Sequence, residues 1–316
     1  MFLLAFEKIV IYILFFTAGF FIFETKTVGP KASGTLSQIV MNVFLPLMVF
    51  DSVAQNCTIA NIHLYGILFA CGFVLLLIVH FTGELIARIL GGSYLERITN
   101  VYTTVIPNYG FMGYPMILAL FGNEMLSRFA VMVLPITIYS FMIGMPKFNP
   151  ADATTFSERF RKAMNLTLAA NLVGIVYGLS GLPYPSLIQE ICRMGADCIG
   201  PMTMVITGIT IARVGLKDSF RNGRAAVMSG IRSVVLPALL IFGTYLLCRE
   251  TGLDKTVFIC TAIYSVFPAP LNTIIFAENY GLDGSYGASC ALISMLASII
   301  TVPLWLQIAV NLFETL

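Results

Sequence analysis

Ten long apolar runs, separated by short polar turns, constrain the fold of this chain more than any other feature of its sequence. The runs fall near residues 4–23, 35–55, 64–90, 98–121, 126–146, 163–181, 186–212, 226–248, 256–277 and 285–312. Each is close to the roughly 20 residues that an α-helix needs to cross a bilayer. Only 11% of the 316 residues are charged, against about 25% in ordinary soluble domains. The sequence therefore predicts an all-α polytopic membrane protein with ten transmembrane helices.

The basic residues predict which ends of these helices face the cytoplasm. If both termini lie on one side, five of the 18 Lys and Arg residues fall on that side, and thirteen, Arg232 among them, fall on the other. Cytoplasmic loops carry the excess of Lys and Arg. We therefore expect a multi-pass protein of the cell membrane (inner or plasma membrane) with both termini extracytoplasmic.

A repeat divides the chain into two halves. The longest polar segment, Lys147–Lys162, separates five predicted helices from five others. Because five is odd, the second half enters the membrane in the opposite sense, as in many secondary transporters. Thr104-Val-Ile-Pro107 in the fourth helix is matched by Ser265-Val-Phe-Pro268 in the ninth, 161 residues later. We expect two inverted five-helix repeats, residues 1–150 and 163–316, joined by a cytoplasmic linker, residues 151–162.

Helices 4 and 9 each contain a proline break at membrane depth. Non-helical backbone is tolerated there only inside the protein or along a wet cavity. Asn108 follows the break at Pro107, and Asn272 follows the break at Pro268. The second half of each helix would point the positive end of its dipole at the midplane. Two such ends and two amides predict an anion site with no Lys or Arg beside it; a plain proline kink is the simpler alternative.

Three segments that carry these features are similar to a known family. They are Asn42-Val-Phe-Leu-Pro-Leu-Met-Val-Phe50, Pro107-Asn-Tyr-Gly-Phe-Met-Gly-Tyr-Pro115 and Val266-Phe-Pro-Ala-Pro-Leu-Asn-Thr-Ile-Ile-Phe-Ala-Glu-Asn-Tyr-Gly281. They resemble the bacterial auxin efflux carrier (AEC) family, which includes the malonate-transporter-like permeases and is related to the plant PIN carriers. The resemblance runs the length of the chain, although the long cytoplasmic loop of the plant carriers is absent.

The resemblance implies an architecture and a mode of action. Helices 4 and 9 would be broken and would cross each other. Helices 1, 2, 6 and 7 would form a scaffold, and helices 3–5 and 8–10 a mobile transport domain. A homodimer would carry small organic anions across the bilayer by an elevator-type motion. The substrate-binding positions carried over from the family are Pro107, Asn108, Gly110, Pro268, Pro270 and Asn272.

One acidic residue in the second helix is a candidate for ion coupling. Asp51 follows the apolar run Val43–Phe50, and Gln55 lies about one turn later. Acidic residues inside membranes usually mark ion or proton pathways, so Asp51 and Gln55 are candidate coupling residues for a proton. The alternative is that Asp51 lies near the outer interface, where water solvates it. Sodium is a second candidate ion, although the sequence shows no oxygen-rich cage for it.

The remaining motifs argue against an enzyme, a metalloprotein and a nucleic-acid-binding protein. Gly178-Leu-Ser-Gly181 matches the nucleophile motif of rhomboid-type proteases, but the two histidines, His63 and His80, both precede it. The seven cysteines show no metal-binding spacing. No P-loop motif for ATP is present, and the basic residues are dispersed. We expect no enzyme activity, no cofactor, no metal and no nucleic-acid partner.

The sequence thus predicts a secondary membrane transporter of a small organic anion, such as a mono- or dicarboxylate. Two alternatives stay open. One is a membrane sensor or receptor that uses the same anion pocket, and the other is a sodium-coupled organic-anion symporter of related fold. Binding and flux of carboxylates, measured with and without sodium, distinguish the three.

Overall fold

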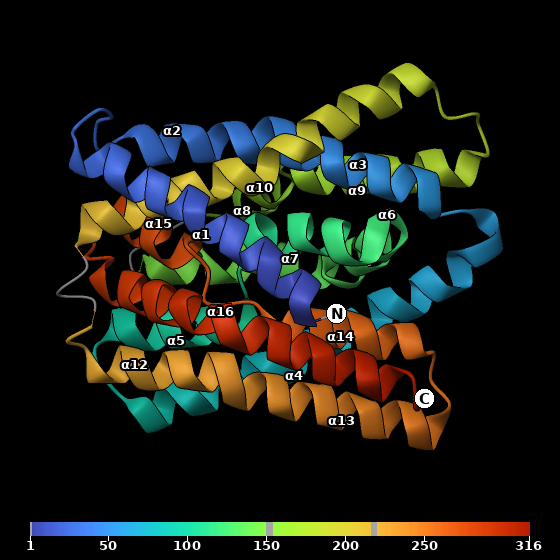
Figure 1. The fold of residues 1–316 in the computed structure, drawn as a ribbon. Helices are drawn as coiled ribbons and strands as arrows, with labels where there is room; N and C mark the ends of the chain where they lie inside the picture. Colours follow the sequence, from blue (N-terminus) through green and yellow to red (C-terminus); the bar gives the residue numbers. More distant parts are fainter. Residues whose placement is uncertain (1, 150–153, 216–219) are drawn as a thin grey trace.

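The chain is almost entirely helical in the computed structural model, which describes residues 2–149, 154–215 and 220–316 (Figure 1). The α-helices are α1 (Phe2–Glu24), α2 (Ala32–Ile39), α3 (Leu45–Asn56), α4 (Ile62–Leu90), α5 (Tyr94–Val105), α6 (Tyr114–Met132), α7 (Leu134–Tyr139), α8 (Phe156–Ala163), α9 (Leu166–Ser180), α10 (Ser186–Val214), α12 (Gly223–Gly230), α13 (Leu236–Thr251), α14 (Lys255–Val266), α15 (Asn272–Asn279) and α16 (Ser285–Phe313). The described residues also include π-helical turns at Val40–Phe44, Tyr109–Gly113, Ser140–Gly144 and Ile231–Val235. They contain no β-strand, so the all-α prediction is confirmed.

The helices follow the predicted apolar runs. Within the described residues, six continuous helical stretches are long and apolar enough to cross a membrane, and up to eight if each of two bent pairs counts as one span. The bent pairs are Tyr94–Met132 with Leu134–Phe148, at 50°, and Phe156–Ala163 with Leu166–Ser180, at 68°. The ninth predicted run contains the shorter helices α14 and α15. The fold is that of a multi-pass membrane protein, and the ten-helix inverted repeat stays a prediction.

Local sequence explains where several helices begin and end. Ser93 begins α5 with a capping box, in which its hydroxyl accepts a hydrogen bond from the Glu96 N–H and its own N–H donates to the Glu96 carboxylate at 2.7 Å. Helices α9 and α13 end at Gly181 and Gly252, which both adopt the left-handed conformation. Glycine adopts this conformation without steric cost and is therefore common after helix ends. These signals satisfy backbone groups at the ends of the spans.

The predicted linker is partly helical. Its residues 151–153 lie outside the described part of the chain, and α8 follows a capping box formed by Thr155 and Glu158. The N–H and hydroxyl of Thr155 donate to the Glu158 carboxylate, and these bonds lower the pKa of Glu158 below its usual value. Phe156 and Phe160 are exposed, and their rings stack. Helix α8 therefore presents an aromatic pair beside charged residues, as helices at a membrane surface do.

Glycines let four of the helices pack backbone to backbone. A Cβ atom on Gly208 of α10 would lie 2.0 Å from the Phe16 carbonyl oxygen of α1, and one on Gly19 would lie 2.2 Å from the Val205 carbonyl oxygen. A Cβ atom on Gly178 of α9 would likewise meet the backbone at the end of α3. Small residues allow such close approach between membrane helices. The four helices α1, α3, α9 and α10 correspond to predicted helices 1, 2, 6 and 7.

A second group of helices is built from both halves of the chain. Helix α4 packs on α5, α13 on α14, and α16 on both α12 and α14; these helices occupy the lower half of Figure 1. The Tyr286 hydroxyl of α16 donates to Asn100 Oδ1 of α5 at 2.7 Å, and Arg224 of α12 pairs with Glu96 of α5 at 3.0 Å. This group contains predicted helices 3, 4, 8, 9 and 10. Its movement as one transport domain stays a prediction.

Candidate functional site

Two helices are interrupted where the sequence predicts breaks. Helix α5 ends at Val105, and helical structure resumes only at Tyr109, in the π-helical turn that leads into α6. Helix α14 ends at Val266, and α15 begins at Asn272. Each gap contains proline, which has no N–H to donate and whose ring clashes with the preceding helical turn. The broken helices are therefore a direct consequence of the local sequence.

The two breaks lie against each other. The N–H of Asn108 donates to the Pro268 carbonyl oxygen at 2.9 Å. The Tyr264 hydroxyl donates to the carbonyl oxygen of Val105, the last residue of α5. A buried backbone group without a partner is costly, and here each break supplies partners for the other. Segments that are far apart in the sequence thus form one polar crossing inside the protein.

A buried arginine also lies at this crossing. The prediction that no Lys or Arg lies beside the breaks is wrong, because Arg232, which is counted among the cytoplasmic basic residues, lies there. Its side chain is 0% exposed, and it lies in the π-helical turn between α12 and α13. The guanidinium donates to the carbonyl oxygens of Phe267 at 2.9 Å, Ser265 at 3.1 Å, Tyr264 at 3.2 Å and Thr104 at 3.5 Å. Burial is tolerated because the broken helices supply carbonyl groups that replace water.

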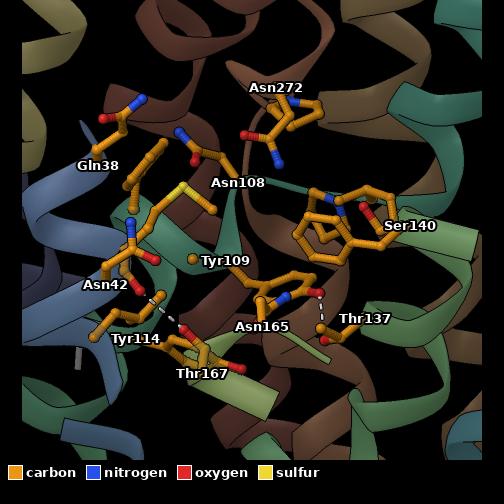
Figure 2. A pocket seen from close by; sticks show the side chains of 18 residues that line it. Gln38, Asn42, Asn108, Tyr109, Tyr114, Thr137, Ser140, Asn165, Thr167 and Asn272 are labelled. Carbon is orange, nitrogen blue, oxygen red and sulfur yellow. Dashed lines mark hydrogen bonds between the residues drawn. The ribbon is translucent and has the colours of Figure 1, made fainter. Parts of the chain in front are cut away.

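A cavity of about 270 Å³ lies beside the crossing (Figure 2). It runs from the buried Asn108 to Gln38 and Asn42, which are exposed. In the described part of the chain, no charged side chain lines it. Its polar lining consists of Gln38, Asn42, Asn108, Tyr109, Tyr114, Thr137, Ser140, Asn165, Thr167 and Asn272. Such a cavity suits a small polar ligand that is held by hydrogen bonds.

Five of the six predicted substrate-binding residues line this cavity. They are Pro107, Asn108, Gly110, Pro270 and Asn272. The sixth, Pro268, does not line it, and its carbonyl oxygen instead accepts the hydrogen bond from the Asn108 N–H. The structure therefore brings both predicted amides to one cavity and gives Pro268 a part in holding the crossing together.

The side chains of both predicted amides reach the cavity (Figure 2). The side-chain amide of Asn108 makes no hydrogen bond to any residue that the structure describes, although the residue is only 5% exposed. Asn272 Nδ2 lies 3.5 Å from the Tyr102 hydroxyl, which shares a 2.6 Å hydrogen bond with Ser140. The Tyr109 N–H donates to the Pro107 carbonyl oxygen at 2.8 Å, and the next N–H groups of each helix that resumes after a break have no partner within the helix. The cavity therefore offers several uncharged donors to one ligand.

The part of the lining that comes from α2 and α9 was not predicted. Gln38 and Asn42 come from α2 and the π-helical turn after it, and Asn165 and Thr167 from the start of α9. Asn165 caps α9, and the Thr167 hydroxyl donates to the Met41 carbonyl oxygen at 3.3 Å. The usable sequence signal is Asn42, an amide inside an apolar run. Gln38 and Asn165 lie near helix ends, where polar residues are expected in any case.

The candidate coupling residues lie outside the cavity. Asp51 and Gln55 are on α3, and neither lines it. Asp51 Oδ1 accepts hydrogen bonds from Gln55 Nε2 at 2.7 Å and from the Tyr184 hydroxyl at 2.8 Å, and Asn123 Nδ2 donates to Oδ2 at 3.4 Å. This cluster links α3 to α6 and to the segment before α10. The structure does not join it to the predicted substrate-binding residues.

The chemistry of the site is that of amides, hydroxyls and backbone groups. Within residues 2–149, 154–215 and 220–316, no group of three or more His, Cys, Asp or Glu side chains could hold a metal ion. The cavity lining contains tyrosine, threonine, serine and amide side chains. Such groups bind and orient a ligand through hydrogen bonds.

Similar proteins are known from archaea and bacteria. A family described as membrane transport protein matches residues 4–162 and 153–306. A protein of Methanothermobacter thermautotrophicus, described as an uncharacterized transporter, is 24% identical over 289 residues, which cover 91% of this chain and 92% of the relative. The uncharacterized transporter MJ1031 of Methanocaldococcus jannaschii is 23% identical over 322 residues, which cover 96% and 99%. The uncharacterized transporter YfdV of Escherichia coli is 20% identical over 307 residues, which cover 92% and 93%. The chain therefore belongs to the membrane transport protein family, the family of the auxin efflux carriers.

Proposed function

We propose that this membrane transporter is a secondary carrier of a small organic anion, such as a mono- or dicarboxylate. The observation that carries the proposal is the meeting of two helix breaks beside a cavity lined by uncharged amides and hydroxyls. Helix N-termini and N–H donors attract a carboxylate. No fixed cation lines the cavity within the described residues. The ligand is therefore held by hydrogen bonds and can dissociate. A carrier needs this moderate affinity because it must release its cargo.

The size of the cavity favours a small cargo. Its volume of about 270 Å³ lies just below the roughly 300–1,000 Å³ of pockets for drug-sized ligands. Malonate, malate and lactate are carboxylates of suitable size. An indole carboxylate tests the upper end of the range.

We also propose alternating access by an elevator-type motion. The cavity is lined on one side by α2 and α9 and on the other by the broken helices. Its lining includes the exposed Gln38 and the partly exposed Asn165, which lie near the ends of predicted helices 2 and 6 that the basic residues predict to be cytoplasmic. Toward the opposite side, the buried Ser52 hydroxyl donates to the Asn123 carbonyl oxygen at 2.7 Å and joins α3 to α6. These features fit an inward-facing state of a carrier that works as a homodimer in the cell membrane, with both termini outside.

A flux panel tests the proposed cargo. Purified protein in liposomes is offered labelled malonate, malate, lactate and an indole carboxylate under imposed pH, sodium or voltage gradients. We expect at least one carboxylate to enter faster than into protein-free liposomes. Tight binding without flux favours the sensor, and strict sodium dependence favours the symporter. If no carboxylate binds or moves under any gradient, the proposed substrate class is wrong.

The same liposomes test proton coupling through Asp51. If the Asp51 carboxylate carries the coupling proton, Asp51→Asn removes the dependence of flux on the pH gradient. An unchanged dependence in this variant excludes Asp51 as the proton carrier.

A further inference from the structure

Four helix ends and one buried charge meet at the crossing of the two breaks. Helices α5 and α14 end there with carbonyl groups, and the helices that resume at Tyr109 and Asn272 begin there with N–H groups. Each helix end corresponds to about half an elementary charge, negative at the carbonyl end and positive at the N–H end. On their own, the two negative and two positive ends nearly cancel. The cavity beside them would then have little preference for an anion.

Arg232 disturbs this balance because its hydrogen bonds go to the carbonyl ends alone. Three of its four acceptors lie at the end of α14, and the fourth, the Thr104 carbonyl oxygen, lies at the end of α5. None of the ion pairs among the described residues includes Arg232. Its guanidinium also lies 5.9 Å from the centre of the Tyr264 ring. The positive charge of Arg232 is therefore balanced by helix carbonyls rather than by a carboxylate.

We propose that Arg232 is a positioning residue that gives the cavity its selectivity for anions. Its charge offsets the two carbonyl ends and leaves the N–H ends at Tyr109 and Asn272 to dominate the field in the cavity. Arg232 does not line the cavity, so it acts through the broken helices and not by touching the ligand. One guanidinium also spans carbonyl groups from both halves of the chain, which holds the crossing in one geometry. The inference deepens the proposed function and rests on it for the identity of the anion.

Charged thiol reagents measure the field in the cavity without a substrate. Gly110 lines the cavity, and a Cβ atom there would meet no atom within 4 Å, so Gly110→Cys introduces a reactive thiol. An anionic and a cationic methanethiosulfonate of similar size are compared by mass spectrometry of the peptide that contains position 110, because native Cys198 is also exposed. The ratio of the two rates is divided by the same ratio for free cysteine. A change in the reactivity of the thiol affects both reagents alike and therefore does not change this normalised ratio.

With Arg232 intact, we expect the anionic reagent to react faster at position 110. At an effective dielectric constant of about 20, two unit charges interact by more than about 1 kcal/mol at any separation up to roughly 10 Å, and over such a separation the ratio of an anion to a cation changes by at least roughly tenfold. Arg232→Gln is therefore expected to lower the ratio by at least that factor. Arg232→Lys keeps the charge with fewer donors, so it should keep the ratio even if the melting temperature falls. A purely structural role would change stability or both rates together and leave the ratio unchanged.

Two results would overturn the proposal. One is an unchanged ratio in Arg232→Gln protein that elutes as a single species. The other is a preference for the cationic reagent while Arg232 is intact, a result that needs no Arg232 variant to fold. The reagents are not substrates, so this outcome is independent of the flux panel. Absence of carboxylate flux together with an Arg232-dependent ratio rejects the proposed cargo and supports the part assigned to Arg232.

Discussion

Asn108 uses its backbone and its side chain for different purposes. Its N–H donates to the Pro268 carbonyl oxygen at 2.9 Å, and its own carbonyl oxygen accepts from the N–H groups of Met112 and Gly113 at 3.1 Å each. These bonds hold the break in place and survive any change of side chain. The side-chain amide faces the cavity. The residue can therefore lose its ligand contact without losing its structural contacts.

Asn108→Ala and Asn272→Ala are each expected to weaken carboxylate binding with little change in melting temperature. A hydrogen bond to a charged group contributes about 1.5–3 kcal/mol, which corresponds to a loss of affinity of roughly 10- to 100-fold. Titration calorimetry on purified protein measures this loss, for the carboxylate that the flux panel identifies. Asn311→Ala, at an exposed position of α16, is the matched control. Wild-type affinity in both cavity variants would reject the site.

At the scale of helical elements, each π-helical turn among the described residues is followed by a proline two residues after its end. The residues after the turns are Leu45-Pro46, Tyr114-Pro115, Met145-Pro146 and Leu236-Pro237. Proline lacks an N–H and its ring clashes with the carbonyl group four residues earlier, so the helix widens there. These turns bring Asn42, Gly110 and Ser140 to the cavity, and Arg232 to the crossing. Proline is not sufficient, since α10 and α16 contain proline inside a continuous α-helix.

The contact between α1 and α10 depends on glycine. Gly208→Ala places a Cβ atom 2.0 Å from the Phe16 carbonyl oxygen, so the two helices must separate. Overpacking of this kind costs about 1–3 kcal/mol, and we expect a lower melting temperature in detergent. The control is Gly243→Ala on the exposed face of α13, where no atom lies within 4 Å of the new Cβ. Equal melting temperatures for the two variants would contradict the close packing.

At the scale of the whole molecule, two Arg–Glu ion pairs differ in what they connect. One joins the predicted scaffold to the predicted transport domain, and the other lies inside the predicted transport domain. Arg213 of α10 pairs with Glu278 of α15 at 2.7 Å, so this pair joins the predicted scaffold to the predicted transport domain. Arg224 of α12 pairs with Glu96 of α5 at 3.0 Å, inside the predicted transport domain. An elevator-type motion must separate the first pair and leave the second intact.

Crosslinking distinguishes the two pairs. We expect a short, reducible thiol crosslinker between Arg213→Cys and Glu278→Cys to stop flux, because it ties the moving helices to the scaffold. The same crosslinker between Glu96→Cys and Arg224→Cys should leave flux near the level of that variant before crosslinking. Flux is measured before crosslinking, after it and after reduction. Undiminished flux through the first crosslinked variant would exclude a relative movement of α10 and α15.

The sequence by itself determined the helical class, the positions of the apolar runs and the two interrupted helices. Hydrophobic length and the backbone limits of proline act within a few residues, so Pro107 and Pro268 mark their breaks without knowledge of the rest of the chain. The repeated Thr-Val-Ile-Pro and Ser-Val-Phe-Pro motifs also predicted which breaks correspond. Asn108 and Asn272 could be named as site residues because each follows such a break.

Only the tertiary structure decided which distant groups become partners. A count of basic residues assigns Arg232 to the cytoplasmic side together with the loop residues. The carbonyl oxygens that accept its hydrogen bonds come together only where α5 and α14 meet, so the sequence alone does not reveal them. Gln38 and Asn165 join the cavity because α2 and α9 pack beside the broken helices, and Asp51 lies apart from it because α3 directs that carboxylate toward Tyr184. Local sequence limits backbone conformation, whereas the pairing of buried polar groups depends on packing between segments far apart in the chain.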